Sequence, residues 1–410
     1  YIYIYTMSFI SIPQNLISYY NIPDRNKENP IHIGVFEWNS YITKNNMYDY
    51  YNSFMKGYSN NPSSEDFKGF IENNVEFIDY NNLNNDSKIK AEYNWNNKVP
   101  VRSSEATLDI QIIIGICKLG LHKDDKLTVF IGPGYSDMFS DILLNYLDDD
   151  TIKGKAKIWS NSYGQPANYL YNTNNYNDVI KSLSNKNYQI FVGSGDNGST
   201  DSDYVDDITD LTYYIRPDQP AMFPYITSVG GTMIYNNIEY PSIIFDDSPN
   251  ISNNFSSGGG LENVYLKKNG DSEINPYFTY DYINLYKNSQ KHIEEYIKSE
   301  YTNTDKTIYK GFLKKVIDYS NTNKFYPRAY PDISLSSTNY NIYLNDSNAE
   351  SYLSSQGGTS ASSPLIASIY AIISSNLNLP NEHYGQLNKN LYDAYDNLNW
   401  REKVFNPVYS

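Results

Sequence analysis

Short apolar runs of strand length alternate along this chain with stretches that have helical spacing. The apolar runs lie at residues 31–38, 127–132, 156–162, 188–193 and 226–229. Between them, apolar side chains recur at intervals of three and four residues in 105–119 and 136–147. Because parallel strands need crossover connections, the alternation predicts an α/β fold with a central, mostly parallel sheet flanked by helices on both faces. Ligands bind such sheets where the strands end.

Charge and composition exclude several classes of protein. The 410 residues carry a net charge of −15, whereas binding nucleic acid requires a concentrated basic surface. The excess of acidic side chains is compatible with activity at low pH, where protonation of carboxyl groups reduces the repulsion between them. No apolar run approaches the ~20 residues that cross a bilayer, so we expect no membrane span. The single cysteine, Cys117, excludes an internal disulfide and is interpreted as a packed core thiol.

The strongest local signal is the run GGTSASSP around Ser360. Its glycines permit a tight turn, and residues 365–377 that follow have helical apolar spacing, so Ser360 should lie at the N-terminus of a buried helix. Unpaired N–H groups at that position stabilise developing negative charge. Ser360 is therefore a candidate nucleophile. The alternative interpretation is a serine that caps an ordinary core helix.

A serine nucleophile needs a base, and two acids are better candidates than the histidines. None of the four histidines has a setting of small residues like that of Ser360; they are His32, His122, His292 and His383. Glu105 and Asp109 are four residues apart, on the apolar face of a predicted helix. Two buried like charges raise each other's pKa, which suits a proton acceptor at acid pH. Alternatively, both acids only border the helix N-terminus.

A third acid, Asp196, follows an apolar strand within the run GSGDNG. An aspartate between glycines at the carboxyl end of a strand is well placed to face a cleft. Protonated at acid pH, Asp196 could donate a hydrogen bond to a tetrahedral oxyanion. Alternatively, the residues form an Asp-Asn-Gly turn without a chemical role.

Together these motifs resemble the sedolisin family of serine-carboxyl peptidases, which includes the lysosomal tripeptidyl peptidase. The match follows nearly the whole chain in order, through LISYYNIP, IHIGVFEW, SEATLDIQ, SNSYG, VGSGDNG, FPYITSVGGT, FSSGGGLEN, PRAYPDIS and GGTSASSP. The resemblance implies a subtilisin-like fold. It also implies maximal activity at acid pH and synthesis behind a long N-terminal propeptide.

The resemblance also implies roles for individual residues. Ser360 would be the nucleophile, Glu105 its general base, Asp109 the partner that orients the base, and Asp196 the acid at the oxyanion. Glu37, in IHIGVFEW, would extend the hydrogen-bond chain to Asp109. One departure is visible within SNSYG, because its tyrosine stands where many relatives carry tryptophan.

For domain organisation, we interpret residues 11–410 as a single peptidase domain and residues 1–10 as a propeptide remnant or an extension. Two polar segments near 200–218 and 267–323 interrupt the pattern and are predicted to be surface insertions.

The C-terminal end departs from the family at the calcium site. Relatives continue into two segments that wrap one calcium ion with oxygen ligands. Here Pro407 stands where the first ligand aspartate is expected, and the later ligands are absent from the sequence. Calcium is therefore expected for the family but is in question for this chain, which we interpret as truncated at this site.

The sequence thus predicts an acid-active peptidase that forms an acyl-enzyme, either as an endopeptidase or by releasing tripeptides from N-termini. Its partners would be peptide or denatured protein substrates and its own propeptide. We expect a monomer, in a lysosome-like acidic compartment or secreted. The competing hypothesis is a catalytically inactive sedolisin-like binding or structural protein.

Overall fold

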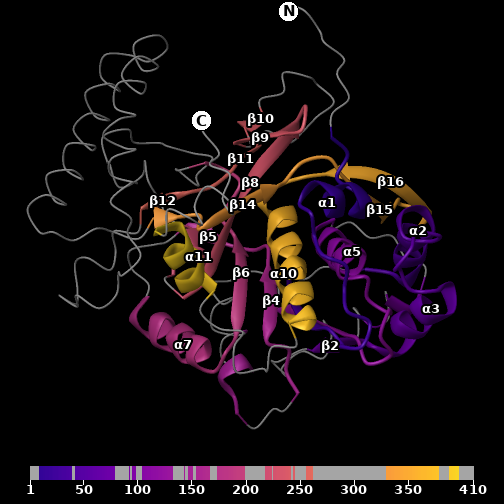
Figure 1. Ribbon diagram of the computed structural model, residues 1–410, viewed down its shortest axis with the longest axis horizontal. Coiled ribbons are helices and arrows are strands. Elements are labelled where there is room, and N and C mark those ends of the chain that lie inside the picture. The colour runs from indigo at the N-terminus through magenta and orange to yellow at the C-terminus, as the bar shows by residue number, and fades with distance from the viewer. Residues whose placement is uncertain are drawn as a thin grey trace, which may run out of the picture.

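The computed structural model describes the residues that form the sheet, its covering helices and the connections near them. These are residues 9–38, 42–78, 104–132, 146–150, 154–166, 173–198, 218–223, 225–241, 243–244, 255–261, 329–377 and 387–396, with positions 92, 95–97 and 143. The helices are α1 (Pro13–Tyr19), α2 (Lys44–Phe54), α3 (Ser64–Asn73), α5 (Glu105–Cys117), α7 (Thr173–Asn185), α10 (Thr359–Asn376) and α11 (Leu387–Asp396) (Figure 1).

The central sheet has the strand order β14-β8-β6-β4-β1-β3-β2. All neighbours along this order are parallel. The strands are β1 (His32–Trp38), β2 (Val75–Ile78), β3 (Lys126–Gly132), β4 (Ile158–Asn161), β6 (Gln189–Gly193), β8 (Thr227–Tyr235) and β14 (Ile333–Ser336). The prediction of a mostly parallel sheet is therefore confirmed. One further strand, β9 (Ile238–Pro241), pairs antiparallel with β8.

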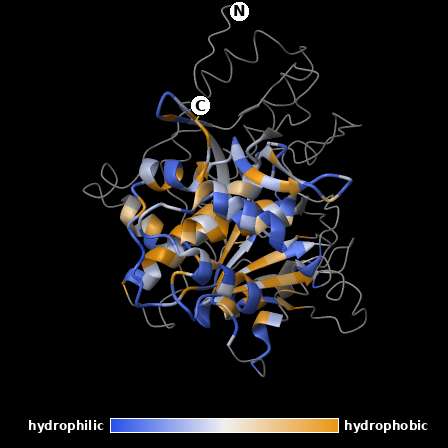
Figure 2. Ribbon diagram, turned by 90° about the vertical axis from the view of Figure 1, so that its right-hand side faces the viewer, coloured by the Kyte–Doolittle hydropathy of each residue, from blue (hydrophilic) through white to orange (hydrophobic). Residues whose placement is uncertain are grey.

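Helices cover both faces of the sheet. One buried cluster joins side chains of α1, α2, α3, α5 and α10 to the strand face that carries Ile33 and Val35. A second cluster joins α7 to the opposite face, which carries Phe36 and Trp159. The strands are therefore apolar on both sides, as parallel strands between two helical layers must be. Figure 2 shows these apolar strands and helix faces at the centre, with hydrophilic residues toward the outside.

Close packing between strands depends on Gly34 of β1. A Cβ atom at this position would lie 2.5 Å from the ring of Trp159 on the neighbouring strand. Any other residue would push the indole away from the strand, so glycine lets the largest buried side chain cover β1.

The direction in which the sheet grows reverses at β1. Strands β3 and β2 lie on one side of it, and β4, β6 and β8 lie on the other. In α/β folds the crevice outside the carboxyl ends of the strands at such a reversal binds ligands. Glu37 lies near the end of β1, Ser162 directly follows β4, and Asp196 follows β6 by three residues. The topology thus gathers three polar side chains at one edge.

Small two-stranded pairings complete the fold. They are β5 (Gln165–Pro166) with β7 (Asp218–Gln219), β10 (Ile243–Ile244) with β11 (Phe255–Ser256), β12 (Gly260–Leu261) with β13 (Ala329–Tyr330), and β15 (Tyr340–Asn345) with β16 (Ser351–Gln356). The β15–β16 hairpin leads directly into α10. It is docked on α5, because the buried Gln111 side chain exchanges two 2.9 Å hydrogen bonds with the backbone of Tyr343.

The predicted elements agree with the structure except in their lengths. Strand β8 continues to Tyr235, beyond the predicted end at Val229, because β14 and β9 pair with its second half. The predicted helix at 136–147 is described only at Leu143, Tyr146 and Leu147, all helical. Of the two predicted insertions, 267–323 lies outside the described residues, as does 200–218 except for its last position. Cys117 is buried, as predicted. No helix in the described parts is long and apolar enough to cross a membrane.

Candidate active site

Ser360 lies in the first turn of α10, at the carboxyl edge of the sheet. The helix starts after Gly358, whose φ of +120° favours glycine. A Cβ there would also lie 2.7 Å from a carboxylate oxygen of Asp196. Ser360 itself is only 9% exposed. The predicted position of Ser360 at the start of a buried helix is thus what the structure shows, and its hydroxyl is largely withdrawn from water.

Glu105 is the first residue of α5, which packs alongside α10. The Ser360 hydroxyl lies within hydrogen-bonding reach of its carboxylate. Burial raises the pKa of Glu105 to about 7, and the nearby charge of Asp196 acts in the same direction, while the bond from Ser360 lowers it. A carboxylate with a raised pKa, bonded to a hydroxyl, is a stronger proton acceptor than an exposed one.

Asp109 lies one helical turn beyond Glu105 and is fully buried. Its Oδ2 accepts a 2.6 Å hydrogen bond from the hydroxyl of Ser162, which also lies 3.1 Å from the backbone oxygen of Ser360. Burial raises the pKa of Asp109 well above its usual value, and Glu37 and Glu105 raise it further. Ser162 therefore ties the acid on α5 to the start of α10.

Glu37 completes a group of three acids with Glu105 and Asp109, which we call the acid cluster. Its side chain is fully buried, and the hydroxyl of Tyr163 donates a 3.1 Å hydrogen bond to its Oε2. The tyrosine ring packs edge-on against Phe36 and Trp38. Burial, and then the charge of Glu105, raise the pKa of Glu37. Because each acid disfavours ionisation of the others, the acid cluster shares its protons.

Asp196 lies beside the start of α10, on the connection after β6. Its Oδ1 accepts hydrogen bonds of 2.7 Å from the backbone N–H of Thr359 and 3.0 Å from the Thr359 hydroxyl. Burial raises the pKa of Asp196, and the two bonds from Thr359 partly offset this effect. The second oxygen, Oδ2, lies beside Gly358. Asp196 can thus keep a proton at a pH where an exposed aspartate has lost it.

The histidines do not enter this arrangement in the described parts of the chain. His32 lies at the opposite end of β1 from Glu37, with Nε2 2.8 Å from the Thr128 hydroxyl. The Nδ1 of His122 accepts a hydrogen bond from the backbone of Asp124. His292 and His383 lie outside the described residues.

Sequence reasoning missed three polar partners of the acids: Ser162, Tyr163 and Thr359. Ser162 and Tyr163 directly follow a buried strand, the same signal that pointed to Asp196. No local pattern pairs the Tyr163 hydroxyl with Glu37, because the two residues are 126 positions apart.

No metal site accompanies these residues. Among the described residues, no group of three or more His, Cys, Asp or Glu side chains is arranged to hold a metal ion. Pro407, where the family's first calcium ligand is expected, lies outside the described residues. We therefore derive no step through calcium.

The buried acids should make the protein less stable as the pH rises. The unfolded chain releases the Glu105 proton near pH 4.5, whereas the folded chain keeps it to about pH 7. Between these values the folded state binds more protons, so stability falls with rising pH, by up to about 3 kcal/mol for this group. Glu105→Gln should therefore lose less stability than the wild type between pH 4.5 and 7.5 in urea titrations. The exposed Glu65→Gln should behave like the wild type, and identical losses in all three proteins would contradict the prediction.

Sequence comparisons identify relatives of this chain. The sequence model of the Subtilase family matches residues 132–392. Tripeptidyl-peptidase SED1 of Arthroderma otae is 24% identical over 413 residues, covering 93% of this chain and 56% of that protein. Tripeptidyl-peptidase SED2 of the same organism is 25% identical over 66% of this chain and 39% of its own length. Aorsin of Aspergillus oryzae is 28% identical over 62% of this chain and 36% of its own length. The matches thus span about half or less of these curated relatives.

Among solved structures, the sedolisin of Pseudomonas, a serine-carboxyl proteinase complexed with pseudo-iodotyrostatin, has a similar fold. The TM-score is 0.59 at 15% identity, over 99% of this chain and 89% of that one. This likeness confirms the predicted subtilisin-like architecture. With the tripeptidyl-peptidases and aorsin, it also confirms the predicted resemblance to sedolisins.

Proposed function

Because the chain belongs to the subtilase family, we propose that it is an acid-active serine-type peptidase that uses a Ser360–Glu105–Asp109 triad. The observation that carries the proposal is the packing of α10 along α5, which brings the Ser360 hydroxyl within hydrogen-bonding reach of a carboxylate whose pKa burial raises. That contact joins a nucleophile to a base without imidazole. The Pseudomonas relative named a serine-carboxyl proteinase supports the same chemistry.

In the proposed reaction, the Ser360 oxygen bonds to the carbon of a peptide carbonyl while Glu105 takes the hydroxyl proton. The carbonyl electron pair moves onto oxygen, and protonated Asp196 donates a hydrogen bond to that oxyanion. The C–N bond then breaks, and the amine leaves with the proton held by Glu105. Water then attacks the carbonyl carbon of the resulting ester while Glu105 takes its proton. The bond to the Ser360 oxygen breaks, Glu105 returns the proton to that oxygen, and the acid product leaves.

The other buried groups would support Glu105 in this cycle. Asp109, held by Ser162, fixes the position of the base and shares its proton. Glu37 extends this proton-sharing set, and Tyr163 holds it in place. For activity, Glu105 in the acid cluster must be ionised so that it can accept the Ser360 proton. Asp196 must at the same time stay protonated so that it can donate to the oxyanion. The opposing requirements predict a bell-shaped pH profile centred below neutrality.

For substrates, we propose peptides and denatured proteins. Release of tripeptides from N-termini is proposed on the names of the relatives, with internal cleavage as the alternative. We further propose that the protein is made with a propeptide and acts as a monomer in a lysosome-like acidic compartment or outside the cell.

The proposal is tested by incubating the purified chain with a mixed peptide library from pH 3 to 8, with added calcium or with chelator. We expect cleavage at roughly pH 3 to 6, the range in which paired carboxyl groups exchange protons. Because the pKa of Glu105 is about 7, the reaction in this range proceeds through the minor fraction of molecules in which Glu105 is ionised while Asp196 is protonated. Product lengths separate tripeptide release from internal cleavage, and the two metal conditions test the dependence on calcium. No cleavage under any condition would favour the inactive binding protein instead.

Replacing Asp196 by asparagine should remove the fall in activity at high pH. Asparagine keeps Oδ1 for the two bonds from Thr359 and presents an amide donor in place of Oδ2, so the fold should survive. Because this donor does not ionise, kcat/KM should stay near its maximum toward neutral pH. The measurement is the pH profile of both proteins, and an unchanged alkaline limb would show that Asp196 does not donate to the oxyanion.

A further inference from the structure

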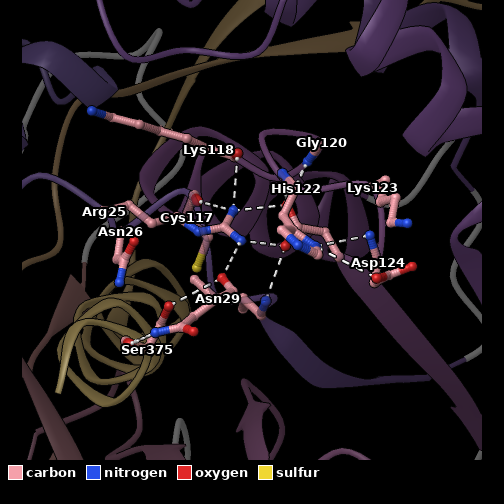
Figure 3. Close-up of polar contacts among 12 residues, drawn as sticks. Arg25, Asn26, Asn29, Cys117, Lys118, Gly120, His122, Lys123, Asp124 and Ser375 are labelled. Carbon is pink, nitrogen blue, oxygen red and sulfur yellow. Dashed lines mark hydrogen bonds and ion pairs between the residues drawn. The ribbon is translucent and has the colours of Figure 1, made fainter. Parts of the chain in front are cut away.

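The segment Asp24–Asn29 fastens the far ends of the two helices that carry Ser360 and Glu105. It follows α1 in the chain and lies at the opposite end of α5 and α10 from the acid cluster. Figure 3 shows the polar contacts of this segment. Arg25 lies between Cys117 and Lys118 at the end of α5 and the residues near His122 that follow, and Asn29 lies beside Ser375 at the end of α10.

Arg25 holds the end of α5. Its side chain is completely buried in an ion pair with Asp125. One guanidinium nitrogen donates to the backbone oxygens of Cys117 and Lys118, at 3.1 and 3.2 Å. These carbonyls close the last turn of α5, where the helix leaves its C=O groups without partners and a positive charge is favourable. The other nitrogen donates to the backbone oxygen of Asn29, at 3.2 Å.

Asp125 ties the same point to the sheet. Its Oδ2 accepts from the backbone N–H groups of Gly120 and His122, at 2.9 and 3.1 Å. Its Oδ1 accepts from the N–H of Ile31, at 2.9 Å, just before β1 begins. The pair thus connects the end of α5 to the entry of the strand that carries Glu37.

The same segment also holds the end of α10. Asn29 and Ser375 exchange side-chain and backbone hydrogen bonds of 2.7 and 3.2 Å. Asn376 accepts from the N–H of Asn26 at 2.6 Å and donates to the oxygen of Asp24 at 2.8 Å. Four hydrogen bonds therefore join six residues of loop to the last turn of α10.

A helix transmits a shift along its axis from one end to the other. At 1.5 Å per residue, the anchored end of α5 lies about 18 Å from Glu105, and that of α10 about 24 Å from Ser360. The two helices pack along each other, and the Cys117 thiol contacts the backbone oxygen of Ser368 at 3.7 Å. Because the interior is close-packed, a slip of either end must appear at the other.

We propose that Asp24–Asn29, together with Asp125, is a clamp that sets the axial register of α5 against α10 and thereby positions Glu105 to accept the hydrogen bond of Ser360. Arg25, Asn29 and Asn376 are positioning residues in this account, since none touches the reacting atoms. The inference rests on the proposed function, in which that hydrogen bond carries the reaction.

The first test is Asn376→Ala, which removes two bonds at the end of α10 without exposing a buried charge. We expect kcat to fall by roughly 10- to 100-fold, because small misplacements of catalytic groups have effects of this size. KM should stay within about twofold. The acid limb of the pH profile should move to higher pH, since a weakened bond from Ser360 lowers the pKa of Glu105 less. The other groups that face Glu105, namely Asp109, Glu37 and Asp196, are unchanged.

The matched control is Asn73→Ala. Asn73 also donates one side-chain bond within the last turn of a helix, α3, which carries none of the proposed catalytic residues. Its kcat and pH profile should equal those of the wild type. If Asn376→Ala lowers the stability of the protein but leaves kcat and the pH profile unchanged, the clamp is only structural and the proposal is overturned.

A second test does not depend on activity. Distant substitutions normally change stability additively, whereas coupled ones do not. Asn376→Ala and Ser360→Ala should show a coupling of at least about threefold in the unfolding equilibrium constant, measured by urea titration of the full chain. Asn73→Ala and Ser360→Ala should be additive. Additivity in both pairs would overturn the clamp, whether or not the wild type has peptidase activity. Absence of peptidase activity in the wild type would refute only the proposed function.

Discussion

Ser360→Ala should abolish peptide hydrolysis while leaving the fold intact. The substitution removes one oxygen from the first turn of a buried helix, a change that alanine accommodates well. Without that oxygen no acyl-enzyme can form, and loss of a serine nucleophile reduces turnover by at least ~10³-fold. The measurement is kcat/KM at the pH optimum, together with mass spectrometry of the protein incubated with a peptide aldehyde, which should add covalently only to the wild type.

The control for this variant is Ser355→Ala. Ser355 is an exposed serine on β16, five residues before Ser360, and its removal should leave activity and aldehyde addition unchanged. If Ser360→Ala keeps the activity of the wild type, the proposed nucleophile is wrong and hydrolysis proceeds at another group.

Glu105→Gln should reduce kcat by ~10² or more. Glutamine has nearly the same shape and can still accept a hydrogen bond from Ser360, but it cannot take up the hydroxyl proton. The nucleophile would then attack without a base. The variant should therefore bind peptide substrates with an unchanged KM and cleave them slowly at every pH, as steady-state kinetics can measure.

Two comparisons make this result specific. The exposed Glu65→Gln, which makes the same chemical change at the surface, should be fully active. Ser360→Ala combined with Glu105→Gln should be no slower than Ser360→Ala alone, because residues that act as a unit are not additive. Full activity of Glu105→Gln would exclude the carboxylate as the base.

Much of the fold was readable from local periodicity. The apolar runs that became β1, β3, β4 and β6 are nearly continuous because both of their faces are buried, a property that belongs to each run by itself. The local sequence did not predict the second half of β8 as a strand, since its two consecutive glycines are typical of a turn. Pairing with β14 and β9 keeps that stretch extended, and no local pattern records those partners.

The candidate site divides in the same way. The spacing of Glu105 and Asp109 predicted one buried helix face, and the structure has both side chains there. The structure buries every residue of α5 after Glu105 and not only one stripe, because α10, α2 and the β15–β16 hairpin enclose the helix from several sides. The contacts of Ser162 with Asp109 and of Tyr163 with Glu37 form because the ends of β4 and β1 lie side by side, which local sequence does not predict.

The amino-acid sequence alone determined which chemical groups this protein has and which of them share a strand or a helical turn. That was sufficient because the periods of helices and strands act over a few residues. Only the tertiary structure decided that Glu105 lies beside Ser360, 255 positions away in the chain, and that Asp24–Asn29 joins the far ends of both helices. Such contacts follow from strand order and close packing, which depend on the whole chain at once.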